Sequence, residues 1–333
     1  MVAYRKNRYL CGEVKPNLIT TMKRIFLLIA ALLAVVSVAA EEPMALRVEK
    51  CDLYGTLALP ESGSRTVALI IAGSGATDRD GNNRAAGLIT DCYKQLSDSL
   101  VANGYAALRY DKRAIAASAS AAISESELTF DDYINDAVAW VEHLVADVRF
   151  DRVVLVGHSE GSLIALAAAK RTDKVVAVIS LAGPGESIDQ TLRRQLATQP
   201  EPYKTECYRI IDELKAGRMV EDAPAELAVL FRKSVQPFLI SEMRYNPADE
   251  ARALRVPLLI VQGTTDIQVE TADAARLFMA QRMARMVVID DMNHVLKICP
   301  TTNPQQQMAT YMDPSRPIAA KLVRAVVDFM GGL

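Results

Sequence analysis

The chain has 333 residues, of which 50% are hydrophobic, enough for one large core or for a core with a small appended domain. Its formal net charge is −2 at pH 7 and it has no long run of like charge, so nothing predicts a nucleic-acid-binding surface. The 16 glycines and 14 prolines are close to average usage, which excludes collagen-like and disordered classes.

The N-terminal segment has the pattern of a secretory signal peptide. Two basic residues after Met22 precede an apolar run over 25–36, and small residues follow up to Ala40. We therefore interpret residues 1–40 as an N-terminal extension plus signal peptide, with Met22 as the true start. Cleavage near Ala40 predicts a periplasmic or secreted protein without a membrane span in the mature chain. The alternative is an uncleaved anchor, although a bilayer span needs about 20 apolar residues.

Export places the remaining cysteines in an oxidising compartment. Two disulfides, in any of three pairings, and four separate buried thiols are equally compatible with the sequence. No two cysteines have C-x-x-C spacing, so no zinc site or redox motif is predicted. The cysteines concerned are Cys51, Cys92, Cys207 and Cys299.

Strand-like and helix-like segments alternate from about residue 65 onward, after one or two antiparallel strands over 46–59. Strands are expected over 67–72, 105–110, 152–156, 174–181, 257–262 and 285–289, and helices over 89–103, 129–145 (with Thr129 as N-cap), 162–170, 271–281 and 318–329. Several strands are continuous apolar runs, as in parallel sheets that helices cover on both faces. The pattern predicts an α/β fold with a mostly parallel central sheet and an antiparallel edge.

The stretch between the strands at 174–181 and 257–262 breaks this alternation. It consists of polar helices separated by prolines and contains no good strand. We interpret residues 186–250 as an inserted helical cap, here called the cap segment, and residues 41–185 and 251–333 as the core. Four residues of the cap segment can line an apolar substrate site or form its own core: Phe231, Phe238, Met243 and Tyr245.

The pentapeptide G-H-S-E-G at 157–161 matches the G-x-S-x-G pattern of a nucleophile elbow. In this turn a serine sits on strained backbone between a strand and a helix, and flanking glycines permit close approach of neighbouring backbone. The helix that follows favours negative charge at its N-terminus. The expected strand before the pentapeptide and helix after it provide the required context, so Ser159 is the candidate nucleophile.

The base of such a site must follow the nucleophile in the chain. Three histidines are present. His143 lies within an expected helix, and His158 lies in the elbow, where we expect it to point away from the side that Ser159 faces. His294 follows the strand at 285–289 in a polar loop and is the candidate base.

The acid that orients the base should lie between the two in sequence. Asp266 follows the strand at 257–262, and a carboxylate on that exit loop can reach the imidazole of His294 and hold its productive tautomer. Asp290 and Asp291 are competitors, but they are too near His294 in the chain to approach its far nitrogen easily.

An acyl-transfer site also needs two backbone N–H groups as an oxyanion hole. One should belong to Glu160, the residue after the nucleophile. The other should come from the glycine-rich turn at 73–75, with Ser74 as the candidate and Gly75 as the alternative. A simple tight turn is the competing interpretation of this segment.

The segment from Gly73 to Asn82, G-S-G-A-T-D-R-D-G-N, resembles the G-S-G-x-x-D-R-D-G-N signature of bacterial α/β-hydrolases known as esterases or serine aminopeptidase-like hydrolases. The segment R-Y-D-K-R at 109–113, the G-H-S-E-G pentapeptide and the pair N-H at 293–294 are similar to the same family. The resemblance covers about residues 46–333.

The resemblance implies the α/β-hydrolase fold, with Ser159, Asp266 and His294 as catalytic residues and the amides of Ser74 and Glu160 as oxyanion donors. One departure is Ala114, where the family usually has glycine, and it leaves the conformation of this loop open.

The resemblance gives no catalytic role to five charged loop residues, so we favour an ion-pair network that fixes the oxyanion loop over substrate binding. These residues are Asp78, Arg79, Asp80, Asp111 and Arg113.

We therefore expect a serine hydrolase that cleaves small-molecule carboxylic esters with short to medium acyl chains through an acyl-enzyme intermediate. No metal or organic cofactor is required for this chemistry. A peptidase or amidase with the same residues is the alternative, and a non-catalytic binding protein is a third interpretation that the complete set of residues disfavours.

Overall fold

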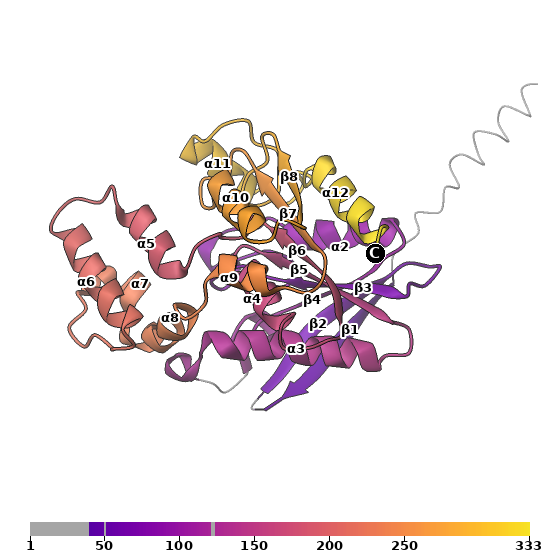
Figure 1. Ribbon diagram of the computed structural model, residues 1–333, viewed down its shortest axis with the longest axis horizontal. Coiled ribbons are helices and arrows are strands. Elements are labelled where there is room, and N and C mark those ends of the chain that lie inside the picture. Colours follow the sequence, from indigo (N-terminus) through magenta and orange to yellow (C-terminus); the bar gives the residue numbers. More distant parts are fainter. Residues whose placement is uncertain (1–39, 50, 121–123) are drawn as a thin grey trace, which may run out of the picture. The chain divides into compact units, whose positions relative to one another are not determined.

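The computed structural model in Figure 1 describes residues 40–49, 51–120 and 124–333. The chain divides into residues 1–38 and 39–333, and all described residues belong to the second unit. The predicted signal peptide and the alternative membrane anchor lie outside the described residues. Within the described ranges, no helix combines the length and apolar character that a membrane crossing requires.

One sheet organises the described part of the chain. Its strands are β1 (Ala40–Val48), β2 (Cys51–Leu59), β3 (Thr66–Ile71), β4 (Ala106–Tyr110), β5 (Arg152–His158), β6 (Val175–Leu181), β7 (Leu258–Gly263) and β8 (Arg285–Ile289), in the order β1-β2-β4-β3-β5-β6-β7-β8. β1 and β2 pair antiparallel, as do β2 and β4, whereas the pairs from β4 through β8 are parallel. The predicted mostly parallel sheet with an antiparallel edge is confirmed.

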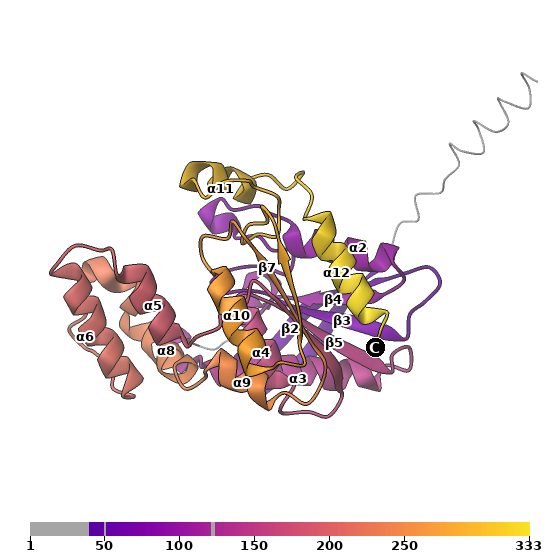
Figure 2. The same ribbon diagram turned by 45° about the horizontal axis from the view of Figure 1, so that its top comes forward.

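Helices cover both faces of the sheet (Figures 1 and 2). The core helices are α2 (Cys92–Ala102), α3 (Phe130–Ala146), α4 (Glu160–Ala168), α9 (Pro247–Ala253), α10 (Thr271–Ala280), α11 (Pro304–Tyr311) and α12 (Ala320–Met330). Successive side chains of a strand point to opposite faces, so Leu69 of β3 packs with α3 and α4, while Ile70 packs with α2 and α12. The doubly covered sheet explains why the strands read as continuous apolar runs.

The loops at one end of the sheet contain three short 3-10 turns, η1 (Arg84–Ala86), η2 (Ala116–Ser120) and η3 (Glu125–Glu127). Thr129 is the N-cap of α3, as predicted, and its backbone N–H donates to the Asp132 carboxylate at 2.8 Å. The four cysteines described above are separate buried thiols, so the structure has the second of the two alternatives for them.

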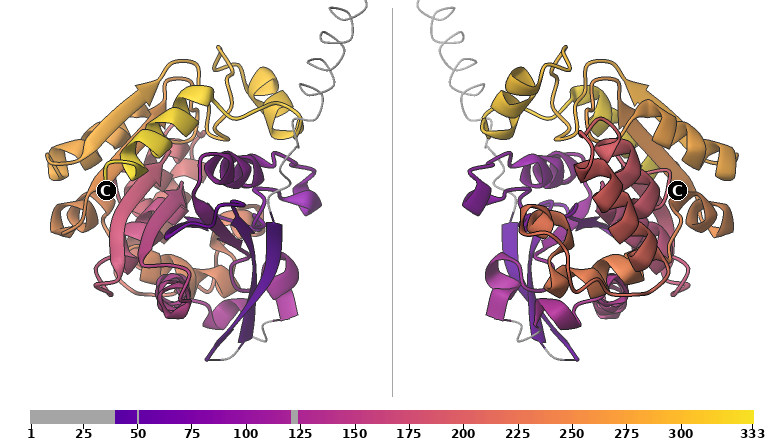
Figure 3. Two further views of the ribbon diagram at one scale, coloured as in Figure 1. Left: turned by 90° about the vertical axis from the view of Figure 1, so that its right-hand side faces the viewer. Right: turned by 90° about the vertical axis from the view of Figure 1, so that its left-hand side faces the viewer.

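The cap segment forms α5 (Ile188–Leu196), α6 (Tyr203–Lys215), α7 (Ala228–Phe231) and α8 (Gln236–Glu242), with 3-10 turns η4 (Ala225–Leu227) and η5 (Lys233–Val235). The right-hand view of Figure 3 looks onto these helices, which lie in front of the strands. Phe231 and Met243 belong to an apolar cluster of the cap segment itself. Phe238 and Tyr245 instead pack on Phe130 of α3. The expected boundary at 250 falls inside α9, which packs on the core through Ala251.

Candidate active site

Ser159 lies in the sharp turn between β5 and α4, at the carboxyl end of a central strand. Its φ of +54° and ψ of −125° are strained for a residue with a side chain. A Cβ added at Gly157 would lie 2.1 Å from the carbonyl oxygen of Gly161, and one added at Gly161 would lie 2.3 Å from that of Ile71. Both glycines are therefore required, and the elbow geometry expected from the pentapeptide is confirmed.

The structure brings Asp266 and His294 together. The Nδ1 atom of His294 lies 2.8 Å from Oδ2 of Asp266, and both side chains are buried. The other carboxylate oxygen, Oδ1, accepts from the backbone N–H groups of Gln268 at 2.8 Å and Val269 at 3.0 Å. Burial alone would raise the pKa of Asp266, but His294 and these N–H groups outweigh it and hold that pKa below its ordinary value. Asp266 is therefore an ionised, fixed acceptor.

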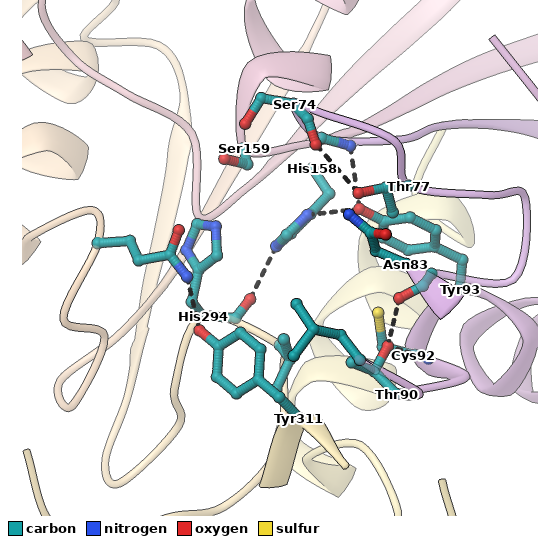
Figure 4. Close-up of a pocket in the computed structure, with 15 residues that line it drawn as sticks. Ser74, Thr77, Asn83, Thr90, Cys92, Tyr93, His158, Ser159, His294 and Tyr311 are labelled. Atoms are coloured by element: carbon teal, nitrogen blue, oxygen red, sulfur yellow. Dashed lines mark hydrogen bonds between the residues drawn. The ribbon is translucent and has the colours of Figure 1, made fainter. Parts of the chain in front are cut away.

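Ser159 and His294 line one pocket with a volume of about 180 Å³ (Figure 4). Ser74, from the loop after β3, lines the same pocket. Neither competing aspartate lines this pocket, and the side chain of Asp290 is 79% exposed and lies 3.7 Å from Lys321. His143, on α3, packs its ring against Trp140. The expected nucleophile, base and oxyanion loop thus share one cavity, and their catalytic roles stay predictions.

The prediction that His158 points away from the site is wrong. Its ring lines the same pocket and lies 4.8 Å from the ring of His294, between centroids. His158 Nε2 donates to the His294 carbonyl oxygen at 2.8 Å, so Nδ1 accepts from the Tyr93 hydroxyl at 2.7 Å. The Tyr93 oxygen in turn accepts from the backbone N–H of Gly73 at 3.0 Å.

The direction of the bond between Tyr93 and His158 belongs to the uncharged ring, because only an unprotonated Nδ1 can accept. Burial and the neighbouring His294 lower the pKa of His158 to about 3, which keeps the ring neutral. Three loops are thereby held together: the glycine-rich turn after β3, the elbow, and the loop that carries His294. Neither His158 nor Tyr93 was assigned this role from the sequence, since nothing local signals their pairing.

The N–H groups of Ser74 and Glu160 have no acceptor among the described residues, as an oxyanion hole requires. Glu160 is the first residue of α4, where the backbone N–H groups have no partner within the helix. The structure therefore leaves two donors free beside Ser159, on the loop and on the helix expected from the sequence.

Lys112 forms hydrogen bonds with both segments that carry these donors. Its ammonium is buried and donates to the Gly73 carbonyl oxygen at 2.7 Å and to the Glu160 carboxylate at 2.8 Å. It also lies 4.6 Å from the centre of the Tyr133 ring. Lys112 occurs in the R-Y-D-K-R segment, which pointed to this loop, but the sequence analysis gave it no role. The structure makes it a positioning residue for the oxyanion loop.

The five charged loop residues all form ion pairs, but only Arg79 and Asp111 pair with each other, and the other three pair with residues outside the set. Asp111 accepts from the backbone N–H of Arg79 at 2.7 Å and from its guanidinium at 2.6 Å. Arg113 pairs with Asp136 of α3 at 2.6 Å, and both are buried. These pairs fix the loops behind the pocket. Among the residues described, no three metal-binding side chains gather in one place.

The sequence model of the alpha/beta hydrolase family matches residues 68–310 of this chain. Among curated proteins, esterase EstD from Thermotoga maritima is 26% identical over 262 residues, which are 73% of this chain. The chain spans 58% of the length of that relative.

Solved structures share the fold at low sequence identity. An esterase from Pyrococcus furiosus has a TM-score of 0.53 at 15% identity and covers 99% of this chain and 100% of its own. Est1E from Butyrivibrio proteoclasticus, solved with ferulic acid bound, has a TM-score of 0.56 at 16% identity, over 87% and 98% of the two chains. An acylaminoacyl peptidase from Pyrococcus horikoshii has a TM-score of 0.56 at 14% identity, over 91% and 43%. The fold is therefore shared by proteins that act on different bonds and does not choose between them.

Proposed function

Because this chain belongs to the alpha/beta hydrolase family, we propose that it is a serine hydrolase that cleaves carboxylic esters with short to medium acyl chains. The observation that carries the proposal is the bond of 2.8 Å between His294 and Asp266 in a pocket whose wall includes Ser159 on its strained elbow. This arrangement supplies a nucleophile, a base and an acid that fixes the tautomer of the base.

In the proposed acylation step, Ser159 Oγ attacks the ester carbonyl carbon while His294 Nε2 takes the hydroxyl proton. Asp266 stabilises the imidazolium that forms. The carbonyl oxygen becomes an oxyanion, which accepts from the N–H groups of Ser74 and Glu160. The imidazolium then returns its proton to the leaving alcohol, and the acyl group stays on Ser159.

Deacylation repeats this sequence of steps with water as the nucleophile in place of Ser159. His294 takes a proton from water, the hydroxide attacks the acyl carbon, and the same two N–H groups bind the second oxyanion. Collapse releases the carboxylic acid and returns the proton to Ser159. Every proton transfer uses side chains of this chain, and no cofactor enters.

The cavity sizes support small substrates. The pocket that Ser159 shares with His294 has about 180 Å³, and a second cavity that includes Ser159 has about 250 Å³. Both are below the usual range of sites for drug-sized ligands, about 300–1,000 Å³. Short to medium acyl groups fit such volumes.

The test is steady-state hydrolysis of p-nitrophenyl esters from acetate to palmitate by the native chain and by Ser159→Ala. We expect the highest kcat/KM at short to medium chains and a loss of at least about 1,000-fold in the variant. Ser62→Ala, a change at an exposed serine, serves as the matched control. Hydrolysis that survives in Ser159→Ala contradicts the proposal, and faster cleavage of p-nitroanilides favours the amidase alternative.

A further inference from the structure

The cavity of about 250 Å³ lies between the cap segment and the strand ends, next to the nucleophile. Ser74, Ser159 and Glu160 line it from the core, and α5 and α8 line it from the cap segment. Its charged lining residues are three carboxylates, Glu160, Glu186 and Glu242, and no lysine or arginine of the described chain lines it. A substrate bound at Ser159 would therefore meet no cationic side chain of the described residues in this cavity.

Two of these carboxylates have cationic partners. Glu160 is paired with Lys112 at 2.8 Å. Glu186 is paired with Arg194, and with Arg276 at 3.6 Å. Neither arginine lines the cavity, so both neutralise the charge of Glu186 from outside it.

Glu242, at the end of α8, differs from the other two. It is only 5% exposed, and its carboxyl group has no hydrogen-bond or ion-pair partner among the described residues. Its oxygens are not among the enclosed polar atoms that lack a partner, and Glu242 lines the cavity. The carboxyl group is therefore open to a ligand in that cavity.

Burial is the main influence on the charge state of Glu242. Burial raises the pKa of the Glu242 carboxyl well above its ordinary value, and the Glu160 carboxylate raises it further, whereas Lys112 lowers it. A cation beside a buried carboxyl favours its ionised form, and the resulting pair shares the cost of burial. An ammonium group in the cavity could therefore pair with Glu242, which lines it without another partner in the described part of the chain, and Glu242 would ionise beside that group.

We propose that this cavity binds a cationic amine of the substrate, with Glu242 as its counter-ion. The inference rests on the proposed esterase function and specifies its substrate class: carboxylic esters that carry an amine on a short aliphatic arm. Leu163, Ile188 and Leu192 line the same cavity and can contact the methylene groups of that arm. Glu242 is thus a specificity-determining residue.

The experiment compares matched cationic and neutral esters on the native chain. Nitrophenyl 6-aminohexanoate against nitrophenyl heptanoate places the charge on the acyl side, and butyrylcholine against 3,3-dimethylbutyl butyrate places it on the alcohol side. We expect kcat/KM for the cationic ester to exceed that for its neutral isostere by about 10- to 100-fold in one of the two pairs, the effect of one charge-assisted contact.

Glu242→Gln should lower this ratio by at least about tenfold. Glu226→Gln, at an exposed position of the cap segment, should leave the ratio unchanged. If Glu242→Gln does not fold, competitive inhibition of the native chain decides. Hexyltrimethylammonium should inhibit at lower concentration than two neutral compounds, its isostere 2,2-dimethyloctane and the more soluble 1-heptanol.

Ratios near one in both pairs, with the neutral esters hydrolysed, overturn this inference and leave the esterase proposal standing. A native ratio that Glu242→Gln leaves unchanged also overturns the role of Glu242. Absence of hydrolysis of all four esters, with no reaction at Ser159, contradicts the proposed function itself, so the two failures are distinguishable.

Discussion

At the scale of single residues, hydrogen bonds to both carboxylate oxygens hold Asp266 in place. Its Oδ2 faces His294 Nδ1 and also accepts from the Gln262 side chain at 3.1 Å, while Oδ1 accepts from two backbone N–H groups. The carboxylate therefore has one orientation, and it fixes the imidazole in the tautomer whose Nε2 can accept a proton.

Asp266→Asn should lower kcat for p-nitrophenyl butyrate by about 10³- to 10⁴-fold with a small effect on KM. The amide nitrogen donates where the carboxylate oxygen accepted, so it favours the wrong tautomer of His294. Steady-state kinetics with circular dichroism as a check of folding measure this change. A loss of less than tenfold in a folded variant contradicts the role of Asp266.

Ala114 has a φ of +61°, in the left-handed region that alanine adopts at a cost of about 1–2 kcal/mol. The glycine expected here from the family would not bear this strain. Ala114→Gly should therefore stabilise the chain by about 0.5–1 kcal/mol in urea unfolding, because its greater freedom in the unfolded state offsets part of the gain. Ala117→Gly, at a nearby exposed position without positive φ, should destabilise it. An Ala114→Gly variant less stable than the native chain is incompatible with this account.

At the scale of elements, Lys112 joins the end of β4 to the turn after β3 and to the start of α4. Its side chain is 1% exposed and that of its partner Glu160 is 9% exposed. Removing one member of a buried pair leaves the other charge uncompensated, which costs about 3–5 kcal/mol.

Lys112→Met should therefore lower the free energy of unfolding by about 3–5 kcal/mol. Adding Glu160→Gln should recover a large part of this loss, because the unpaired charge is then removed. Urea unfolding of the two single variants and the double variant measures the coupling. Strictly additive effects would show that the two side chains do not act as a pair.

His158 joins three loops and is held in its neutral form by burial and by the neighbouring His294. Its folded-state pKa of about 3 lies below the ordinary value of 6.5, so the unfolded chain takes up the proton first as pH falls. The contribution of this histidine to stability is thus complete above about pH 6.5 and is lost progressively between 6.5 and 3.

Between pH 7 and pH 5, the native chain should lose about 2 kcal/mol more of its unfolding free energy than His158→Gln does. The comparison with the variant is needed because other buried groups titrate in the same window: burial raises the pKa of Asp136 to about 6. Urea titrations at both pH values give the difference. An equal pH dependence of the two proteins would mean that His158 is not held neutral by the fold.

The elements themselves were accessible from local patterns. The helix expected over 89–103 is α2 (Cys92–Ala102), and the continuous apolar strands identified a covered parallel sheet. β1 begins at Ala40, earlier than expected, because its first residues are polar. An edge strand with one solvent-exposed side tolerates Pro43 and neighbouring glutamates.

At the scale of the whole molecule, the sequence motifs located Ser159, Asp266 and His294, because the elbow pattern and the chain order are local or ordinal signals. The surroundings of Lys112, Tyr93 and Glu242 were not predictable, because each depends on packing between segments distant in the chain. The cavity beside Glu242 exists only where the cap segment meets the strand ends. The proposed substrate selection therefore depends on the assembled molecule, whereas the proposed chemistry depends on residues within local motifs.

The central claim is that Ser159 is an activated nucleophile, and fluorophosphonate labelling read by intact mass tests it most directly. We predict that the native chain and the exposed-site control Ser62→Ala each gain the mass of one phosphonyl group, located at Ser159 by peptide mapping, and that Ser159→Ala gains none. An unlabelled native chain, or labelling that persists in Ser159→Ala, would contradict the claim.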